Sequence, residues 1–281
     1  GSAMTGFRDI PFDAARQVAG GVRAASAARR SCVRIAIEVD EGAPAYLVSC
    51  VRDAFVPQTS TGLLHIAAFD AGGTVRVNPD CDAAIVLAGT SGAAPGVARA
   101  FCAAGVPSAI VVESSVEAPS SLSSAGIEVI ASSSPESLLD KLAEWLSRSC
   151  KADVSLGANF PFVRRAVSRR SIGARSSQNA VIGLLPFGSG ADLPLMTANQ
   201  MLMDLDLAGA YGQGASSSRL VEATAVLAGA YASRALSRRL SKSLPGLGAL
   251  VRAGVAYGAT LALGEALRLR FEVPNAWNHR K

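Results

Sequence analysis

The sequence predicts an α/β fold, a mostly parallel sheet with helices on both faces, together with a separate all-α helical domain. From residue 31 to about residue 146, short apolar runs alternate with amphipathic stretches, as expected of a parallel sheet whose crossovers are helices. From about residue 179 to residue 271 no segment has the pattern of a strand. The chain has 281 residues, 49% hydrophobic and only 17% charged, a composition that excludes a disordered protein.

The predicted strands are short apolar runs bounded by turn residues. They are residues 33–39, 63–69, 83–88, 108–112 and 127–131, with 75–77 as a further short strand. The helices predicted between them are residues 45–55, 95–104 and 134–148, with a short helix or turn at 120–125. Pro57 and Gly105 follow the first two helices, and Ser134 is the expected N-cap of the third.

The second half of the chain predicts only helices after a basic connector. The connector, residues 151–178, carries two arginine pairs and leads into or includes a basic helix. The helices predicted beyond it are residues 179–186, 192–211, 216–240 and 247–272, and a further one is expected at 12–30. The expected organisation is therefore an N-terminal helix (1–30, with 1–4 a tag remnant), an α/β domain (31–150), the connector (151–178), an α-helical domain (179–272) and a tail (273–281).

The charge balance is basic, with a formal net charge of +5. Lysine occurs at only four positions, so arginine supplies 23 of the 27 basic residues. Such a chain can bind nucleic acid or anionic lipid. We do not expect specific nucleic-acid binding, because the basic residues lack the interleaved aromatic side chains of such surfaces.

The five cysteines predict neither a zinc site nor a disulfide framework. No two have the C-x-x-C spacing, and the chain has only two histidines. We interpret them as small buried residues in a reducing compartment. This favours a cytoplasmic protein, with attachment to the inner face of the membrane as an alternative.

Residues 244–263 are the candidate for a membrane-spanning segment, because they form a nearly continuous apolar run of about 20 residues. Arg252 near the middle and the predominance of Ala and Gly argue against insertion. The sequence leaves both a soluble bundle and membrane insertion open, and favours the first.

The turn after the first predicted strand is unsuited to phosphate binding. Residues 38–46 contain no G-x-x-x-x-G-K-[ST] motif, and Glu38, Asp40 and Glu41 would repel a triphosphate. The Gly-rich turn between a strand and a helix is 89–96, and its first residues are the candidate anion loop: Gly89, Thr90, Ser91 and Gly92. A plain connecting loop is the other interpretation of 89–96, and the sequence favours it.

No catalytic or metal-binding residue is predicted. His65 lies inside an apolar strand and is expected to be a buried core histidine, and no G-x-S-x-G motif is present. The candidates for interaction with a partner are instead polar residues of the second half: Arg164, Arg165, Arg169, Arg170, Asp192, Asn199 and Gln200. Asp192, Asn199 and Asp206 are seven residues apart and share one helix face. This face is either a hydrogen-bond network or a solvent face, and the sequence favours the solvent face.

Several segments of the first half resemble a bacterial GTPase domain of the Era/Ras-like type. They are residues 82–87, 106–112 and 127–134, followed by the helix at 138–146. The phosphate loop is missing, Glu113-Ser114-Ser115-Val116 replaces Asn-Lys-x-Asp, and only Asp70 and Gly73 keep the D-x-x-G spacing. Residues 182–186, 191–203, 207–212 and 244–248 resemble the uncharacterised helical domain that follows GTPase domains in some bacterial proteins.

This resemblance implies a Rossmann-like pseudo-GTPase without cofactor, whose function is that of a scaffold or interaction protein at a membrane surface. A protein partner is then expected, an anionic membrane is a candidate partner, and a homo-oligomer is compatible with the sequence. One alternative is a small-molecule protein that binds a nucleotide or CoA through Gly89–Gly96. A second alternative is an integral membrane protein anchored through the C-terminal helices.

Overall fold

The computed structural model describes residues 30–72, 74–114, 126–184, 192–213 and 247–273, with scattered residues between 20 and 28 and between 229 and 240. The chain divides into two compact units. One is Ala28–Val167, and the other combines Gly1–Ala27 with Ser168–Lys281. The division lies within a helix and 17 residues beyond the predicted domain end at residue 150.

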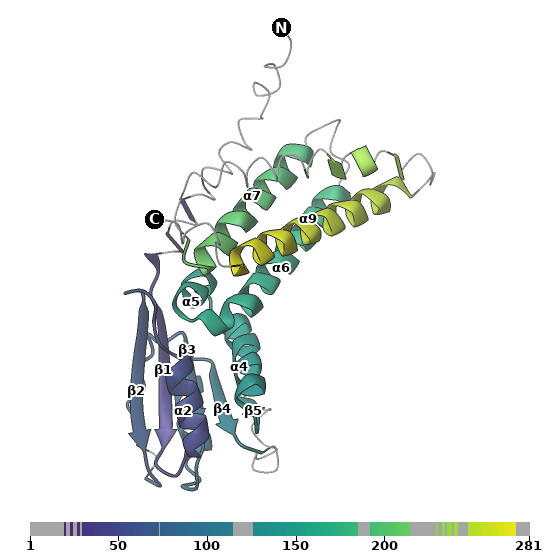
Figure 1. The fold of residues 1–281 in the computed structure, drawn as a ribbon. Helices are drawn as coiled ribbons and strands as arrows, with labels where there is room; N and C mark the ends of the chain where they lie inside the picture. Colours follow the sequence, from purple (N-terminus) through teal and green to yellow (C-terminus); the bar gives the residue numbers. More distant parts are fainter. Residues whose placement is uncertain are drawn as a thin grey trace. The chain divides into compact units, whose positions relative to one another are not determined.

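The unit Ala28–Val167 contains a five-stranded parallel sheet with the order β2-β1-β3-β4-β5 (Figure 1). Its strands are β1 (Val33–Asp40), β2 (Gly62–Phe69), β3 (Ala83–Leu87), β4 (Ser108–Val112) and β5 (Glu128–Ala131). The prediction of a parallel α/β sheet is thus confirmed, and the five strands agree with their predicted ranges to within a residue. The prediction of a strand at 75–77 is wrong, since these residues have no regular structure.

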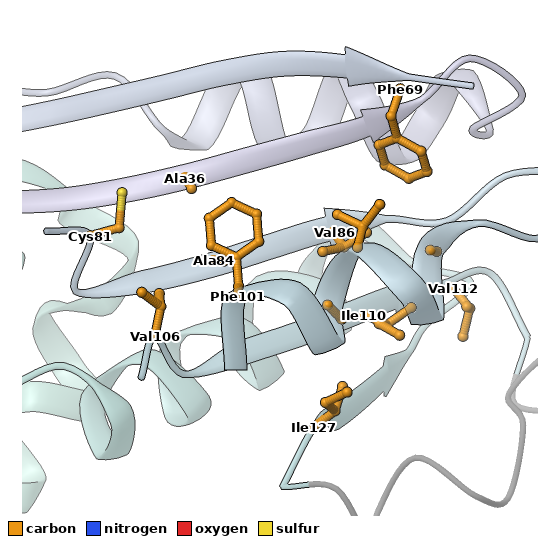
Figure 2. Packing of buried hydrophobic residues seen from close by; sticks show 13 residues of the cluster. Ala36, Phe69, Cys81, Ala84, Val86, Phe101, Val106, Ile110, Val112 and Ile127 are labelled. Atoms are coloured by element: carbon orange, nitrogen blue, oxygen red, sulfur yellow. The ribbon is translucent and has the colours of Figure 1, made fainter. Parts of the chain in front are cut away.

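Every residue of β3 and β4 is buried, which shows that both faces of the sheet are covered. The helices that follow the strands are α2 (Ala45–Ala54), α3 (Ala94–Ala103) and α4 (Pro135–Ser149). Helix α3 packs on one face through Phe101, which lies among Ala36, Ala84 and Ile110 of three strands (Figure 2). The predicted N-cap of α4 is confirmed, since the Ser134 hydroxyl accepts a hydrogen bond from the Ser137 N–H.

The predicted connector is helical over most of its length. It contains α5 (Asp153–Asn159), a 3₁₀ turn (Pro161–Val163) and the start of α6 (Arg164–Leu184). Because no proline interrupts the chain between residues 162 and 185, α6 continues through residues 179–184. The prediction of a separate short helix at 179–186 is therefore wrong.

Asn159 at the end of α5 fastens the start of β2. Its side-chain oxygen accepts hydrogen bonds from the N–H and the hydroxyl of Thr59, at 3.0 and 2.9 Å. Its side-chain NH₂ donates to Thr61 Oγ1 at 2.9 Å. A Cβ added at Gly62 would lie 2.6 Å from the Asn159 oxygen, which is why the strand opens on glycine.

In the unit that contains Ser168–Lys281, α6 from Ser168 onward is accompanied by α7 (Asp192–Ala210) and α9 (Gly248–Glu272). These two helices agree closely with predictions 192–211 and 247–272. The buried contacts among them involve Ile172, Met203, Leu207, Ala208, Leu267 and Phe271. The predicted helices 12–30 and 216–240 lie largely outside the described residues, and the segment 120–125 lies wholly outside them.

Among the helices that the structure describes, none combines the length and the apolar character needed to cross a bilayer. This includes α9, which contains most of the candidate segment 244–263.

Replacement by alanine is expected to have opposite effects on stability at two glycines of α9, Gly264 and Gly258. A Cβ at Gly264 would lie 2.7 Å from two side-chain carbons of Ile172 and 3.0 Å from the Met203 sulfur, whereas a Cβ at Gly258 would meet nothing within 4 Å. We expect Gly264→Ala to destabilise the protein by about 1–3 kcal/mol through overpacking. We expect Gly258→Ala to stabilise it by up to about 1 kcal/mol, because alanine has the higher helix propensity. Denaturant unfolding of the two variants checks this, and equal effects would contradict the tight α6–α9 contact.

Candidate functional site

The candidate site lies at the carboxyl ends of β1 and β3. The strand order reverses between these two strands, since β2 follows β1 to one side and β3 lies on the other. In doubly wound sheets a ligand binds at such a switch point, outside the carboxyl ends of the strands. Here the position is formed by Asp40 at the end of β1 and by the predicted anion loop, Gly89–Gly92, after β3.

Asp40 is turned into the protein and joins the two loops. It is 1% exposed. Its carboxylate accepts hydrogen bonds from the Ser91 hydroxyl at 2.5 Å and from the Gly42 N–H at 3.0 Å. The backbone N–H groups of Gly89 and Ser91 also act to lower the pKa of this carboxyl. Asp40 therefore engages donors from both loops.

The protonation of Asp40 follows from these contacts. Burial alone would raise the pKa of this carboxyl. The hydrogen bonds from Ser91, Gly42 and Gly89 outweigh that effect and hold the pKa below its usual value. The carboxylate is consequently ionised at neutral pH and acts as a resident anion at the loop.

The two loops also touch through their backbones. A Cβ added at Gly89 would lie 2.3 Å from the carbonyl carbon of Gly42. A Cβ at Gly42 would lie 2.2 Å from Thr90 Oγ1. Glycine is required at both positions because the chains approach so closely, and this contact leaves little room between the strand ends.

The loop leads directly into α3. Ser91 Oγ accepts a hydrogen bond from the Ala93 N–H at 3.1 Å while its proton is donated to Asp40. Gly92 has a φ of +74°, a conformation that favours glycine. The structure thus brings Gly89, Ser91 and Gly92 together around an internal carboxylate, and Thr90 is exposed beside them.

Glu38 is the second buried carboxyl at this end of the sheet. It lies two residues before Asp40 on the same face of β1, opposite Ala67 of β2 and Val86 of β3. It is 0% exposed, and neither of its carboxyl oxygens has a hydrogen-bond partner. Desolvation raises its pKa to about 7. The third carboxylate of this stretch, Glu41, is exposed.

The candidate arginines all lie on α6. Arg165, Arg169 and Arg170 are exposed, whereas Arg164 is half-buried and donates through Nε to the Gly157 carbonyl at 3.0 Å. Arg164 and Arg165 belong to the unit Ala28–Val167. Arg169 and Arg170 belong to the unit that contains Ser168–Lys281, called the helical unit below.

The polar candidates of α7 form part of a buried hydrogen-bond network. Asn199 donates to the Arg175 carbonyl at 3.0 Å and to the Asn179 side-chain oxygen at 2.9 Å. Asn179 and Gln200 both donate to the hydroxyl of Thr260 on α9, at 2.8 and 3.1 Å. Asn199 and Gln200 thus bond to α6 and α9, and the side chain of Asp192 lies outside the described ones.

Arg175 closes this network at its edge. It donates to Asn199 Oδ1 at 2.9 Å and to Asp206 Oδ2 at 2.8 Å. The interpretation of the Asn199 face as a hydrogen-bond network is therefore the one that the structure bears out. From the sequence Arg175 is a candidate for contact with anionic lipid, whereas the structure pairs it with Asn199 and Asp206. Sequence reasoning missed Asn179 and Thr260, for which the only signal is polar residues inside an otherwise packed helical pattern.

A groove of about 550 Å³ lies beside the network, between α6 and α7. Its walls are mostly apolar, and its polar lining residues are Arg175, Ser177, Gln178 and Asn199. The apolar lining residues are Val181, Ile182, Leu195, Ala198 and Leu202.

The structure also shows the surroundings of His65, of the cysteines and of the acidic side chains. The expectation of a buried His65 is wrong, because β2 is at the sheet edge and His65 is exposed. All five cysteines are unpaired, and only Cys81 and Cys150 are buried. Within the residues that the structure describes, no three His, Cys, Asp or Glu side chains are grouped to hold a metal ion.

Comparison with known proteins gives no relative for this chain: no family model, no curated protein and no solved structure matches it.

The buried Glu38 predicts a fall in stability as the pH rises. Its pKa is about 7 in the folded protein and 4.5 as the ordinary value, so the folded state binds the extra proton between these pH values. The free energy of unfolding should therefore decrease from about pH 4.5 to pH 7, by about 3 kcal/mol in total. Glu38→Gln removes this titration and should flatten the slope in urea unfolding measured across that range.

Asp40, the neighbouring buried carboxyl, is not expected to contribute to this pH dependence. Its pKa is lowered from 3.8, so its stabilising effect is complete above that value and is lost only at lower pH. An unchanged slope between pH 4.5 and 7 in Glu38→Gln would show that Glu38 is not the titrating group.

Proposed function

We propose that the chain is a non-catalytic scaffold or interaction protein of the pseudo-GTPase type, built on a sheet that has lost its nucleotide site and joined to a separate all-α domain. The observation that carries the proposal is the place of Asp40. Its buried carboxylate accepts hydrogen bonds from the Ser91 hydroxyl and the Gly42 N–H, at the position where a doubly wound sheet binds its ligand.

A nucleotide phosphate meets two obstacles at this position. The donors that would bind it are already engaged with an ionised carboxylate, so binding requires the loss of charge-assisted hydrogen bonds inside the protein. The backbone contact between Gly42 and Gly89 also narrows the space at the strand ends. No lysine lies in residues 38–46 or 88–96 to offset the negative charge.

The resemblance to Era/Ras-like domains supports the same conclusion from the sequence. The strand and helix segments of that family are recognisable, whereas its phosphate-binding and guanine-reading motifs are replaced at 38–46 and 113–116. Because a fold does not fix a function, a framework without its ligand site can serve another role, and we propose that this role is the binding of a protein partner.

The membrane-surface part of the proposal rests on the exposed arginines of α6. Arg165, Arg169 and Arg170 are exposed, and none of them has an ion pair among the described residues. A basic side chain near an anionic bilayer contributes about 1 kcal/mol. We propose that the protein is cytoplasmic and acts at the inner face of the membrane.

The second candidate function is binding of a small nucleotide or CoA at Gly89–Gly96. It is favoured by the place of this loop, at the switch point and directly before α3. A ligand there would have to share or displace the Asp40 contacts.

A thermal-shift screen with GTP, GDP, ATP, NAD and CoA, each with and without Mg²⁺, separates these functions. We expect no saturable shift, whereas a ligand at 100 times its Kd would stabilise the protein by about 2.7 kcal/mol. A shift with GTP that requires Mg²⁺ would overturn the pseudo-GTPase proposal. A shift with CoA or NAD that Ser91→Ala abolishes would establish the second candidate instead.

Co-sedimentation with vesicles tests the membrane part. We expect binding to phosphatidylserine vesicles and none to neutral phosphatidylcholine vesicles. Reversal of two charges in Arg169→Glu/Arg170→Glu should weaken binding about tenfold or more, at about 1 kcal/mol per basic residue. The matched control is Arg76→Glu/Arg99→Glu, which reverses two exposed arginines away from α6. An equal loss in both variants would mean that net charge, and not α6, governs binding.

A further inference from the structure

The sheet has two edge strands, β5 and β2, and they are protected very differently. β5 has only four residues. Its Glu128 pairs with Arg148 at 3.3 Å, and Lys141 Nζ donates to the carbonyl of its last residue, Ala131, at 2.6 Å. A short strand with charges along it is the usual means by which a protein blocks pairing at a sheet edge.

β2 has none of these protections. Its eight residues, Gly62–Phe69, include no charged residue and no proline, and in the described part of the chain its only strand neighbour is β1. Ile66 is 61% exposed and Leu63 is 42% exposed. A long, uncharged and apolar edge strand is a template for pairing with another strand.

The hydrogen bonds to β1 show which backbone groups of β2 point outward. Val33 N–H donates to the Thr61 carbonyl at 2.9 Å, and Glu41 N–H donates to the Phe69 carbonyl at 3.0 Å. Because alternate residues of a strand face opposite neighbours, the odd-numbered residues of β2 bond to β1. The N–H and C=O groups of Leu64, Ile66 and Ala68 are therefore directed away from the sheet.

We propose that β2 pairs antiparallel with β2 of a second copy of this chain, with the two-fold axis at Ile66. This register sets Ile66 opposite Ile66 of the second copy and Leu64 opposite Ala68 of the second copy. Leu64, Ile66 and Ala68 then each exchange both hydrogen bonds with the residue opposite, as the hydrogen-bonded pairs of an antiparallel ladder do. The two five-stranded sheets become one continuous sheet.

A second copy is favoured over another partner because the strand is complementary to itself. With no charge in Gly62–Phe69, no like charges meet across the axis. The neighbouring register, centred on His65, is less favourable, since it sets Ala68 opposite Gly62. The Gly62 N–H already donates to the Thr59 carbonyl at 3.3 Å, and the space beside Gly62 is filled by Asn159.

Light scattering coupled to size exclusion tests the pairing on the full chain. We expect a dimer of twice the 28.7 kDa chain mass at tens of micromolar. Ile66→Lys places two like charges at the axis and should raise the dimer dissociation constant by about tenfold or more, which corresponds to about 1.4 kcal/mol. Val56→Lys is the matched control, because Val56 is an equally aliphatic residue, 52% exposed, that lies outside β2; it should leave the dimer unchanged.

A backbone pair of variants separates strand pairing from side-chain contacts. Ala68→Pro removes an outward N–H and should give a folded monomer, since the hydrogen bonds to β1 remain. Ala67→Pro removes an N–H directed at β1 and should destabilise the fold itself, which circular dichroism and unfolding measure. A chain that is monomeric without substitution, or a dimer that survives both Ile66→Lys and Ala68→Pro, would overturn the proposal. The pairing does not rest on the proposed function, because the nucleotide screen can fail or succeed without changing the mass of the wild-type chain.

Discussion

The carboxylate of Asp40 is the contact on which the carboxyl end of the sheet depends. It is the acceptor for donors from two loops that are about fifty residues apart in the sequence, at Gly42 and at Gly89–Ser91. Ser91, which donates to Asp40, also accepts a hydrogen bond from the N–H of Ala93, the N-cap residue of α3. The ordering of β1, β3 and α3 at this end is therefore coupled to one buried anion. Any ligand at this position would have to bind against that anion.

The central strands could be predicted from the sequence because β3 and β4 are buried on both faces and so appear as unbroken apolar runs. What periodicity cannot supply is the order of the strands. His65 was expected to be buried because its neighbours are apolar, and it is exposed because β2 lies at the edge. The sequence predicts the helix at 164–184 only in part. A basic helix is expected within or after the connector 151–178, but its continuation through residues 179–184 is not.

At the candidate site, too, the sequence predicts the charge but not the contacts. The carboxylates of residues 38–41 predict that this loop repels a phosphate group. The direction of a side chain depends on tertiary contacts, so the sequence did not predict that Asp40 would turn inward and bind the Gly89–Ser91 loop. In the helical unit, the seven-residue spacing of Asn199 and Asp206 correctly predicts a shared face. It could not say that Asn179 and Thr260 would meet that face from α6 and α9.

Glu38 and Asp40 show how hydrogen-bond donors decide the protonation of a buried carboxyl. The two carboxyls lie on one face of β1, both are buried, and desolvation acts on both. Their pKa values nevertheless move in opposite directions, because Asp40 accepts hydrogen bonds from the Ser91 hydroxyl and the Gly42 N–H and Glu38 accepts none. Glu38 is desolvated with no donor in reach, whereas Asp40 is held by donors of two loops. Under the proposed function, a phosphate at the strand ends would compete with the Asp40 carboxylate for these donors, so we expect the functional contacts of this chain at the edge of β2 and at the exposed arginines of α6.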